Sequence, residues 1–164
     1  MIQKIIKWLP FSLIVFFFIL SLVLINTGYG SFEQILFFPL DNGTGFNGEK
    51  RLVSRTKDRE DRILQTVREV MLGPSELEYK SIVPVETKVQ SIIYRENVLY
   101  LDFSKHFFYE IKGFSIPFQE RMEYMEKNLL FNYSFIHKVI ITINGQLPLS
   151  PYFRIEQDFN NENK

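Results

Sequence analysis

The chain has 164 residues, 19 basic and 19 acidic side chains, a formal net charge of zero and no cysteine. This length accommodates one membrane segment and one domain of roughly 110 to 130 residues, and the lack of cysteine excludes disulfides, thiolate metal ligands and a lipid-bearing N-terminal cysteine. Beyond residue 32 there are 17 basic and 19 acidic residues, so nothing suggests a nucleic-acid partner, which would require a concentrated basic face.

The first predicted element is a transmembrane signal-anchor helix over residues 8–26. Residues 1–7 carry Lys4 and Lys7, and Trp8 to Ile25 follow without a charge. Eighteen helical residues span ~27 Å, close to the ~30 Å hydrocarbon core of a bilayer. Because lysines stay on the cytoplasmic side, we expect a single-pass protein of the cytoplasmic (inner) membrane, with its N-terminus inside and its domain periplasmic.

A cleaved signal peptide is the alternative for this segment. Its apolar region usually runs for 7 to 15 residues and ends in an Ala-x-Ala site. Here the apolar stretch is longer, and the residues after Asn26 are small but include no alanine pair. Length and exit chemistry together therefore favour an uncleaved anchor.

Two strands and a glycine-rich loop come next. We expect strands at 34–38 and 50–55, joined by a loop at 41–49 that contains three glycines. The spacing of Gly43, Gly45 and Gly48 fits the G-x-G-x-x-G dinucleotide fingerprint. That fingerprint needs a helix to follow it, and a strand is predicted instead, so nucleotide binding is not expected.

The first domain helix is predicted from Asp58 to Leu72. Asp58 is a suitable N-cap, and Gly73-Pro74 stops the helix. Apolar residues recur at helical spacing, which predicts a buried stripe packed on a sheet. The stripe comprises Ile63, Leu64, Val67, Val70 and Met71.

A β-hairpin follows. Val89 to Tyr94 and Val98 to Phe103 are β-branched and aromatic runs that flank the polar triplet Arg95-Glu96-Asn97. Alternation along the second run sets Leu99, Leu101 and Phe103 on one face and Tyr100 on the other. We therefore expect Leu101 and Phe103 in the core and Tyr100 outside it.

The remaining elements are a second helix, a last strand and a tail. Ser115-Ile116-Pro117 opens a helix that runs to about Leu130, and 138–143 is a strand so rich in β-branched residues that we expect it at the centre of the sheet. Residues 148–164 form a C-terminal tail. The expected inward residues of the helix are Phe118, Met122, Met125 and Leu129.

Taken in this order, the motifs resemble the GerMN domain, which is named for bacterial sporulation and spore-germination proteins. The resemblance covers residues 33–147. Its matching pieces are Ile35-Leu36-Phe37-Phe38, Leu52-Val53-Ser54-Arg55, Leu72-Gly73-Pro74, Ile82-Val83-Pro84, Val98-Leu99-Tyr100-Leu101-Asp102-Phe103-Ser104 and the run from Lys138 to Asn144-Gly145.

The resemblance implies an α+β fold. It would be a ring-building-motif-like two-layer domain with two helices packed on a small mixed sheet. It also implies an extracytoplasmic module without catalytic activity or cofactor, tethered to the inner membrane through residues 8–26. Its motif residues would be structural: Leu72, Gly73, Pro74, Pro84, Tyr100, Asp102, Ser104, Asn144 and Gly145.

Asp102, Ser104 and His106 lie within five residues and could suggest hydrolytic chemistry. In a strand these residues would share a face, but i and i+2 side chains lie ~7 Å apart. That is too far for the hydrogen bond that activates a serine. The structural interpretation is that Asp102 and Ser104 end the strand and cap the following turn.

Glu120, Glu123 and Glu126 could suggest a cation site, because i and i+3 carboxylates are neighbours on a helix. Arg121 and Lys127 are interleaved with them, and no cysteine is available. A solvated helix face is therefore the preferred interpretation, and no metal site is predicted.

An aromatic group lies between the hairpin and the second helix. It consists of Phe107, Phe108, Tyr109 and Phe114, and it has two interpretations: part of the core beneath a loop, or an exposed patch that contacts another protein. The favoured function is an envelope module that binds copies of itself or other envelope proteins. The alternative is a domain that binds cell-wall glycan near the glycine loop at 41–49. No small-molecule substrate is expected.

Overall fold

The computed structural model describes residues 2–26, 30–43, 45–109 and 116–148. The elements follow the predicted order of strand, strand, helix, hairpin, helix and strand behind an N-terminal helix. Their bounds are α1 Ile2–Asn26, β1 Ser31–Pro39, β2 Phe46–Ser54, α2 Arg59–Leu72, β3 Val89–Arg95, β4 Val98–Phe103, the 3₁₀ turn η1 Lys105–Phe107, α3 Phe118–Asn132 and β5 Lys138–Ile143.

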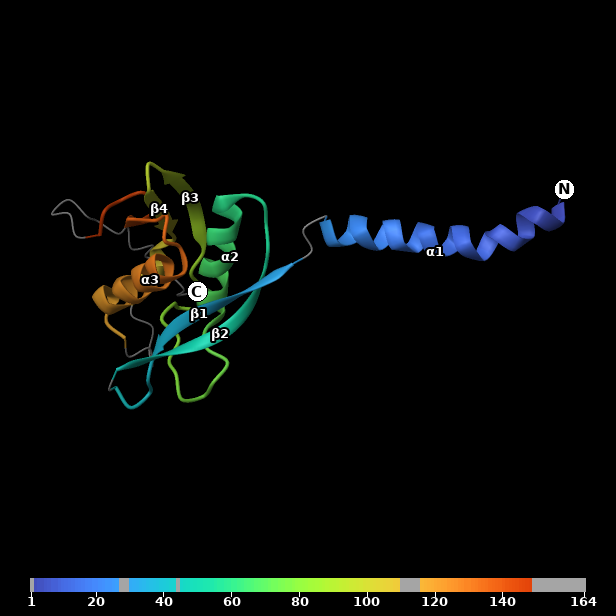
Figure 1. Ribbon diagram of the computed structural model, residues 1–164. Coiled ribbons are helices and arrows are strands. Elements are labelled where there is room, and N and C mark those ends of the chain that lie inside the picture. Colours follow the sequence, from blue (N-terminus) through green and yellow to red (C-terminus); the bar gives the residue numbers. More distant parts are fainter. Residues whose placement is uncertain (1, 27–29, 44, 110–115, 149–164) are drawn as a thin grey trace, which may run out of the picture.

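Helix α1 extends away from the other elements, which pack together (Figure 1). It begins at Ile2, so Pro10 lies inside the helix. Large apolar side chains between Phe11 and Ile25 are 39–75% exposed. Within the described residues, no helix has both the length and the apolar character needed to cross a membrane.

The strands form two sheets, whereas the sequence suggested one. β1 and β2 make an antiparallel pair, and β3, β4 and β5 make a mixed sheet in which β4 is antiparallel to β3 and parallel to β5. The prediction that Lys138–Ile143 is central is wrong, because β5 lies at the sheet edge and β4 takes the centre. The β-branched composition of β5 reflects one buried face, formed by Val139, Ile141 and Ile143.

The predicted hairpin is confirmed, with a two-residue turn. Glu96 and Asn97 have φ values of 49° and 63°, as a tight hairpin whose twist matches its strands requires. Leu101 and Phe103 are fully buried, and Tyr100 on the opposite face is 43% exposed. The prediction of which face of β4 is buried is therefore confirmed.

Both domain helices pack against the strands, and their ends follow the sequence signals. Asp58 accepts a hydrogen bond from Asp61 N–H at 3.1 Å, and Gly73, with φ 82°, closes α2. α3 differs in one respect, since Arg121 is fully buried although a solvated position was expected. Its guanidinium donates to the carbonyls of Phe107, Phe108 and Tyr109 at 2.7, 3.2 and 3.3 Å. Arg121 thus joins α3 to the segment that follows β4.

A buried polar cluster joins β1, α2 and α3. Gln34 donates to the Tyr133 hydroxyl at 3.0 Å, Thr66 donates to Gln34 at 2.8 Å, and Tyr133 donates to the Arg62 carbonyl at 2.8 Å. Burial raises the pKa of Tyr133, although its hydrogen bonds to Thr66 and Gln34 act in the opposite direction. The cluster fixes the two-stranded sheet against both helices.

Candidate functional site: an aromatic surface around Lys127

The most distinctive exposed feature of the domain is a group of aromatic rings on β1, β2 and α3. We call it the aromatic patch; it comprises Phe37, Phe46, Tyr124, Lys127 and Phe131. Tyr124, Lys127 and Phe131 follow one another at i, i+3 and i+7 on α3, a spacing that puts them on one helix face. Phe46 is 48% exposed and Phe131 is 58% exposed, so two large rings face solvent.

The rings contact one another edge to face. The Phe37 ring centroid lies 4.8 Å from that of Phe131 and 5.8 Å from that of Phe46, with interplanar angles of 89° and 85°. Phe46 also meets Tyr124 at 6.4 Å. Edge-to-face pairs are favourable because the ring edge is positive and its face negative.

Lys127 lies among the rings. Its Nζ is 2.7 Å from the ring centroid of Phe46 and 4.9 Å from that of Phe37, a cation–π arrangement. Burial lowers the pKa of Lys127. The lysine stem thereby covers part of the aromatic surface, and the charge is held in place without a carboxylate among these contacts.

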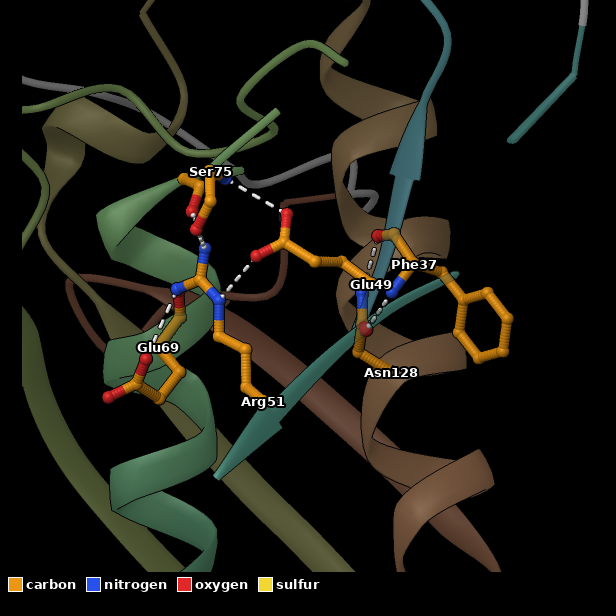
Figure 2. Close-up of polar contacts among 7 residues, drawn as sticks. Phe37, Glu49, Arg51, Glu69, Ser75 and Asn128 are labelled. Atoms are coloured by element: carbon orange, nitrogen blue, oxygen red, sulfur yellow. Dashed lines mark hydrogen bonds and ion pairs between the residues drawn. The ribbon is translucent and has the colours of Figure 1, made fainter. Parts of the chain in front are cut away.

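The backbone beneath the patch is fixed by α3. Asn128 accepts a hydrogen bond from Phe37 N–H at 2.7 Å and donates to the Phe37 carbonyl at 3.0 Å. One turn later, Asn132 makes the same pair of contacts to Ile35, at 3.2 and 2.8 Å. Figure 2 shows the Phe37 ring pointing away from Arg51 and the polar side chains that contact it. The edge of β1 is thus held by side-chain amides while the Phe37 ring is directed outward.

Gly48 allows the Phe37 and Ile35 side chains to lie flat on β2. Phe37 is the cross-strand partner of Gly48 in the β1–β2 pair. A Cβ atom at Gly48 would come within 2.6 Å of Ile35 Cγ2 and 3.4 Å of the Phe37 ring. The third glycine of the G-x-G-x-x-G spacing therefore serves side-chain packing, and it lies within β2 and not before a helix.

The Arg51 cluster holds β2 against the C-terminal end of α2. Arg51 donates to Glu49 at 2.8 Å, to the Glu69 carbonyl at 3.1 Å and to the Gly73 carbonyl at 2.6 Å (Figure 2). A cation at this position interacts favourably with the helix dipole. Burial acts to raise the pKa of Glu49, but hydrogen bonds from Ser75 and Arg51 outweigh it, and the pKa lies below its usual range.

Of the two interpretations of the aromatic group, the structure supports the core for Phe107 and contradicts its place in an exposed interaction patch. Phe107 is fully buried and stacks on Phe103 at 4.5 Å. Phe108 is half-buried against Phe118 at 4.9 Å, and Tyr109 is half-buried beside His106. Phe114 lies outside the described residues. Arg121 draws this segment inward, and the sequence pattern did not reveal that contact.

Two of the motif residues join the strands of the mixed sheet. Asp102 accepts hydrogen bonds from the Thr142 hydroxyl at 2.6 Å and from Gly145 N–H at 2.8 Å, so it fixes the turn at Asn144-Gly145. Ser104 stands at the N-cap of η1 without a capping bond; its hydroxyl instead accepts from Lys88 N–H at 3.0 Å. The predicted capping role of Ser104 is therefore wrong.

The other motif residues end α2 or line the loop after it. Gly73 and Pro84 are buried, Pro74 is half-buried and Leu72 is 76% exposed. The exposure of Leu72 shows that this member of the Leu-Gly-Pro motif does not support the core.

The Ser104 hydroxyl and His106 are closer than strand geometry suggested. Because η1 follows β4 directly, Ser104 Oγ lies 3.5 Å from His106 Nδ1, and His106 Nε2 lies 3.5 Å from Glu86. These distances exceed the 2.6–3.2 Å of an activated nucleophile, and Ser104 is only 8% exposed. Among the described residues, no three acidic or histidine side chains are grouped closely enough to hold a metal ion.

The fold is that of a small α+β domain in which two helices cover a two-stranded and a three-stranded sheet. The sequence profile of the Germane family, described as sporulation and spore germination, matches residues 35–147. Since this match covers more than half of the chain, the chain belongs to that family, and the predicted GerMN-like domain is confirmed. No curated protein sequence compared with the chain gives a match.

Two solved structures of GerMN domains share the fold. The first GerMN domain of the sporulation protein GerM from Bacillus subtilis is 20% identical, with a TM-score of 0.52 over 73% of this chain and 90% of that one. The tandem GerMN domains of the same protein are 19% identical, also with a TM-score of 0.52, over 74% of this chain and 43% of that one. A putative lipoprotein from Clostridium perfringens is 18% identical, with a TM-score of 0.46 over 71% and 77% of the two chains.

Proposed function

We propose that the chain is a non-catalytic interaction module of the bacterial cell envelope, anchored to the inner membrane by α1 with its domain on the extracytoplasmic side. The domain binds other envelope proteins, or further copies of itself, through the aromatic patch. The observation that carries this proposal is the exposure of Phe46 and Phe131 on one face of the domain. Exposed aromatic groups of this kind are typical of protein contact surfaces.

Family membership and the N-terminal segment support the location. Two solved structures of the same fold come from a sporulation protein. In this chain the uncharged run from Trp8 to Ile25 forms part of α1, and its large apolar side chains between Phe11 and Ile25 are exposed. A membrane would supply an apolar environment for them, and attachment raises the local concentration of partners in the same membrane.

Crosslinking in the native envelope tests the role of the aromatic patch. Phe131→Glu places a charge on the patch, and Leu77→Glu is the matched control because Leu77 is an apolar side chain that is 98% exposed and does not belong to the patch. We expect the wild-type chain and Leu77→Glu to give defined protein adducts that Phe131→Glu lacks. Adducts that persist unchanged in Phe131→Glu would contradict the proposal for the patch.

Protease treatment of spheroplasts tests the topology. We expect protease to remove the domain and leave a membrane-bound stub that contains α1. Protection of the whole chain would reverse the orientation. Release of a domain beginning near Ser31 without protease would instead support cleavage of a signal peptide.

Cell-wall glycan is the second candidate ligand, and one observation favours it. Phe46 follows the loop at 41–45, so exposed rings do lie beside the glycine-rich loop, and sugar faces stack on such rings. The amide of Asn47 is less available, since it donates to the Tyr79 hydroxyl at 2.9 Å and accepts from Gly48 N–H. Retention of purified cell-wall glycan by the full chain, lost in Phe46→Ala and accompanied by no protein adducts, would favour this function over protein binding.

A further inference from the structure

A groove of about 580 Å³ lies between α2 and β3. Its apolar lining comes from both elements and is half-buried; it comprises Leu64, Met71, Val89 and Ile92. Its polar lining comprises Arg68, Thr87, Lys88, Gln90 and Ser91. None of these residues belongs to the aromatic patch, so the groove is a separate feature of the domain.

The outer edge of β3 presents backbone groups to this groove. In the sheet order β3-β4-β5, β3 pairs with β4 on one side only. Tyr94 N–H points to the other side, where it donates to the Glu60 carboxylate of α2 at 2.8 Å. Because groups two residues apart on a strand point the same way, the N–H and C=O of Ile92 point there too. Within the described part of the chain, neither has a hydrogen-bond partner on that side.

The charges that line the groove have one sign. Arg68 and Lys88 are exposed cations, and the residues lining the groove include no aspartate or glutamate. Neither cation makes an ion pair with any residue that the structure describes. Both are therefore available to a carboxylate from outside the domain, with which charge-assisted hydrogen bonds would form.

The groove is also lined by a hydroxyl group without a partner. Thr87 is 4% exposed, and its Oγ1 makes no hydrogen bond among the described residues. Such groups are rare in folded proteins, because a polar atom withdrawn from water without a partner is unfavourable. A polypeptide bound in the groove would bring backbone carbonyls that can accept from it.

We propose that this groove binds an extended acidic segment of a partner protein, which adds to the outer edge of β3 as a further strand. The N–H and C=O of Ile92 bond to the backbone of the segment. Its apolar side chains, at alternate positions, pack on Leu64 and Met71, and a carboxylate binds Arg68 and Lys88. Backbone hydrogen bonds of this kind provide affinity, and the side-chain contacts select the sequence.

Two features of β3 limit the length of the added strand. Glu60 already holds the Tyr94 N–H, and the register with β4 shifts between Val89 and Ser91, where a bulge bends a strand. Regular edge geometry is thus confined to the stretch around Ile92. We expect a short segment, whose selection depends on its carboxylate. This site does not depend on what the aromatic patch binds.

Peptide binding to the full chain in detergent tests the charge requirement. The probe is a fluorescein-labelled octapeptide of alternating valine and glutamate, and its counterpart has lysine in place of glutamate. Beyond residue 32 the chain has 17 basic and 19 acidic residues, so non-specific attraction would favour the lysine peptide. We expect the acidic peptide to bind at least ~5-fold more tightly. No binding of the acidic peptide, or equal affinity for both, would overturn the proposal.

Charge reversal locates the binding. Arg68→Glu and Lys88→Glu should each weaken the acidic peptide at least ~5-fold. Lys138→Glu is the matched control, because Lys138 is an exposed lysine of β5, at the opposite edge of the same sheet; it should bind as the wild type does. Equal weakening in all three variants would overturn the assignment to this groove.

Hydrogen exchange on the wild-type chain tests strand addition without any substitution. With saturating acidic peptide, the Ile92 N–H should exchange at least ~10-fold more slowly. The Ile93 N–H, which faces β4, is the control and should not change. Unchanged exchange of Ile92 in the bound state would overturn strand addition. Polyphosphate that displaces the peptide and binds as tightly would also overturn the proposal, and it would assign the groove to anionic polymers.

Discussion

The side-chain amide of Asn128 imitates a neighbouring strand toward Phe37, because it accepts from the Phe37 N–H at 2.7 Å and donates to the Phe37 carbonyl at 3.0 Å. Asn132 repeats the arrangement at Ile35. Two asparagines four residues apart on α3 thus bond the backbone N–H and C=O groups of Ile35 and Phe37, which are two residues apart on β1. Both contacts form because the length of two strand residues is close to that of one helical turn. A two-stranded sheet is thereby joined to a helix through backbone groups.

Replacing Asn128 should destabilise the domain. Asn128→Leu leaves the N–H and C=O of Phe37 without these partners, and each unsatisfied group costs about 1–3 kcal/mol when it is withdrawn from water. We expect a loss of about 2–4 kcal/mol in the free energy of unfolding, measured by urea denaturation of the full chain in detergent. Gln119→Leu is the control, since its hydrogen bond to Glu123 is exposed. Equal stability of the two variants would show that water replaces the amide.

Arg121 should tolerate neither an apolar nor a lysine replacement. Arg121→Met removes the donors to the carbonyls of Phe107 and Phe108, and we expect a loss of about 2–4 kcal/mol. Arg121→Lys should remain destabilised, because an ammonium group cannot reach several carbonyls with the planar geometry of a guanidinium. Arg68→Met at an exposed position of α2 should change stability by less than ~0.5 kcal/mol. Thermal melting of all three variants provides the comparison.

Glu49 should make stability depend on acid pH. Its pKa in the folded domain is below that of the unfolded chain, so the stabilisation is fully present above the unfolded value of ~4.3 and is lost as pH falls through the folded value. We expect unfolding titrations that start well above the unfolded value and continue below it to show a smaller pH-dependent loss of stability for Glu49→Gln than for wild type. Glu86→Gln, on an exposed loop, is the control. Parallel pH profiles for wild type and Glu49→Gln would contradict the assignment.

The hairpin turn should be improved by glycine. Glu96 has a φ of 49°, which costs an L-residue about 1–2 kcal/mol, while glycine loses about 0.5–1 kcal/mol more conformational entropy on folding. Glu96→Gly should therefore stabilise the domain by about 0.5–1 kcal/mol. Arg95→Gly, one residue earlier and inside β3, should destabilise it by a similar amount. A loss of stability in Glu96→Gly would indicate that the Glu96 side chain makes a contact of its own.

Local signals predicted the elements well. The turn residues Glu96 and Asn97, the N-cap Asp58 and the alternation around Leu101 depend only on neighbours in the sequence, and the structure confirms them. The helix and strand periodicities act over the same short range. Element order and the family resemblance followed from these signals.

Contacts between distant segments were the part that the sequence did not predict. Arg121 was expected on a solvated face, because its helical position alternates with glutamates, yet it faces carbonyls of a segment 12–14 residues away. The aromatic patch could not be predicted, because its rings come from three elements and their spacing in the sequence does not show that they are in contact. These rings are Phe37 of β1, Phe46 of β2 and Phe131 of α3. A lone asparagine such as Asn128 on an otherwise inward helix face was the available clue, since buried amides need partners.

The order β3-β4-β5 also determines when each edge of the central strand becomes covered. β3 and β4 are joined by a two-residue turn, so they are close together in the sequence. The other edge of β4 pairs with β5, for example Leu99 with Val139, and β5 comes much later in the chain. The longer loop between β4 and β5 contains α3, and such non-local pairings form slowly. Until β5 arrives, a newly made chain presents the free edge of β4 and its leucines to other unfinished chains. Aggregation during synthesis should therefore begin at β4, and conditions that slow synthesis should increase it, because they lengthen the interval before β5 is made and covers this edge.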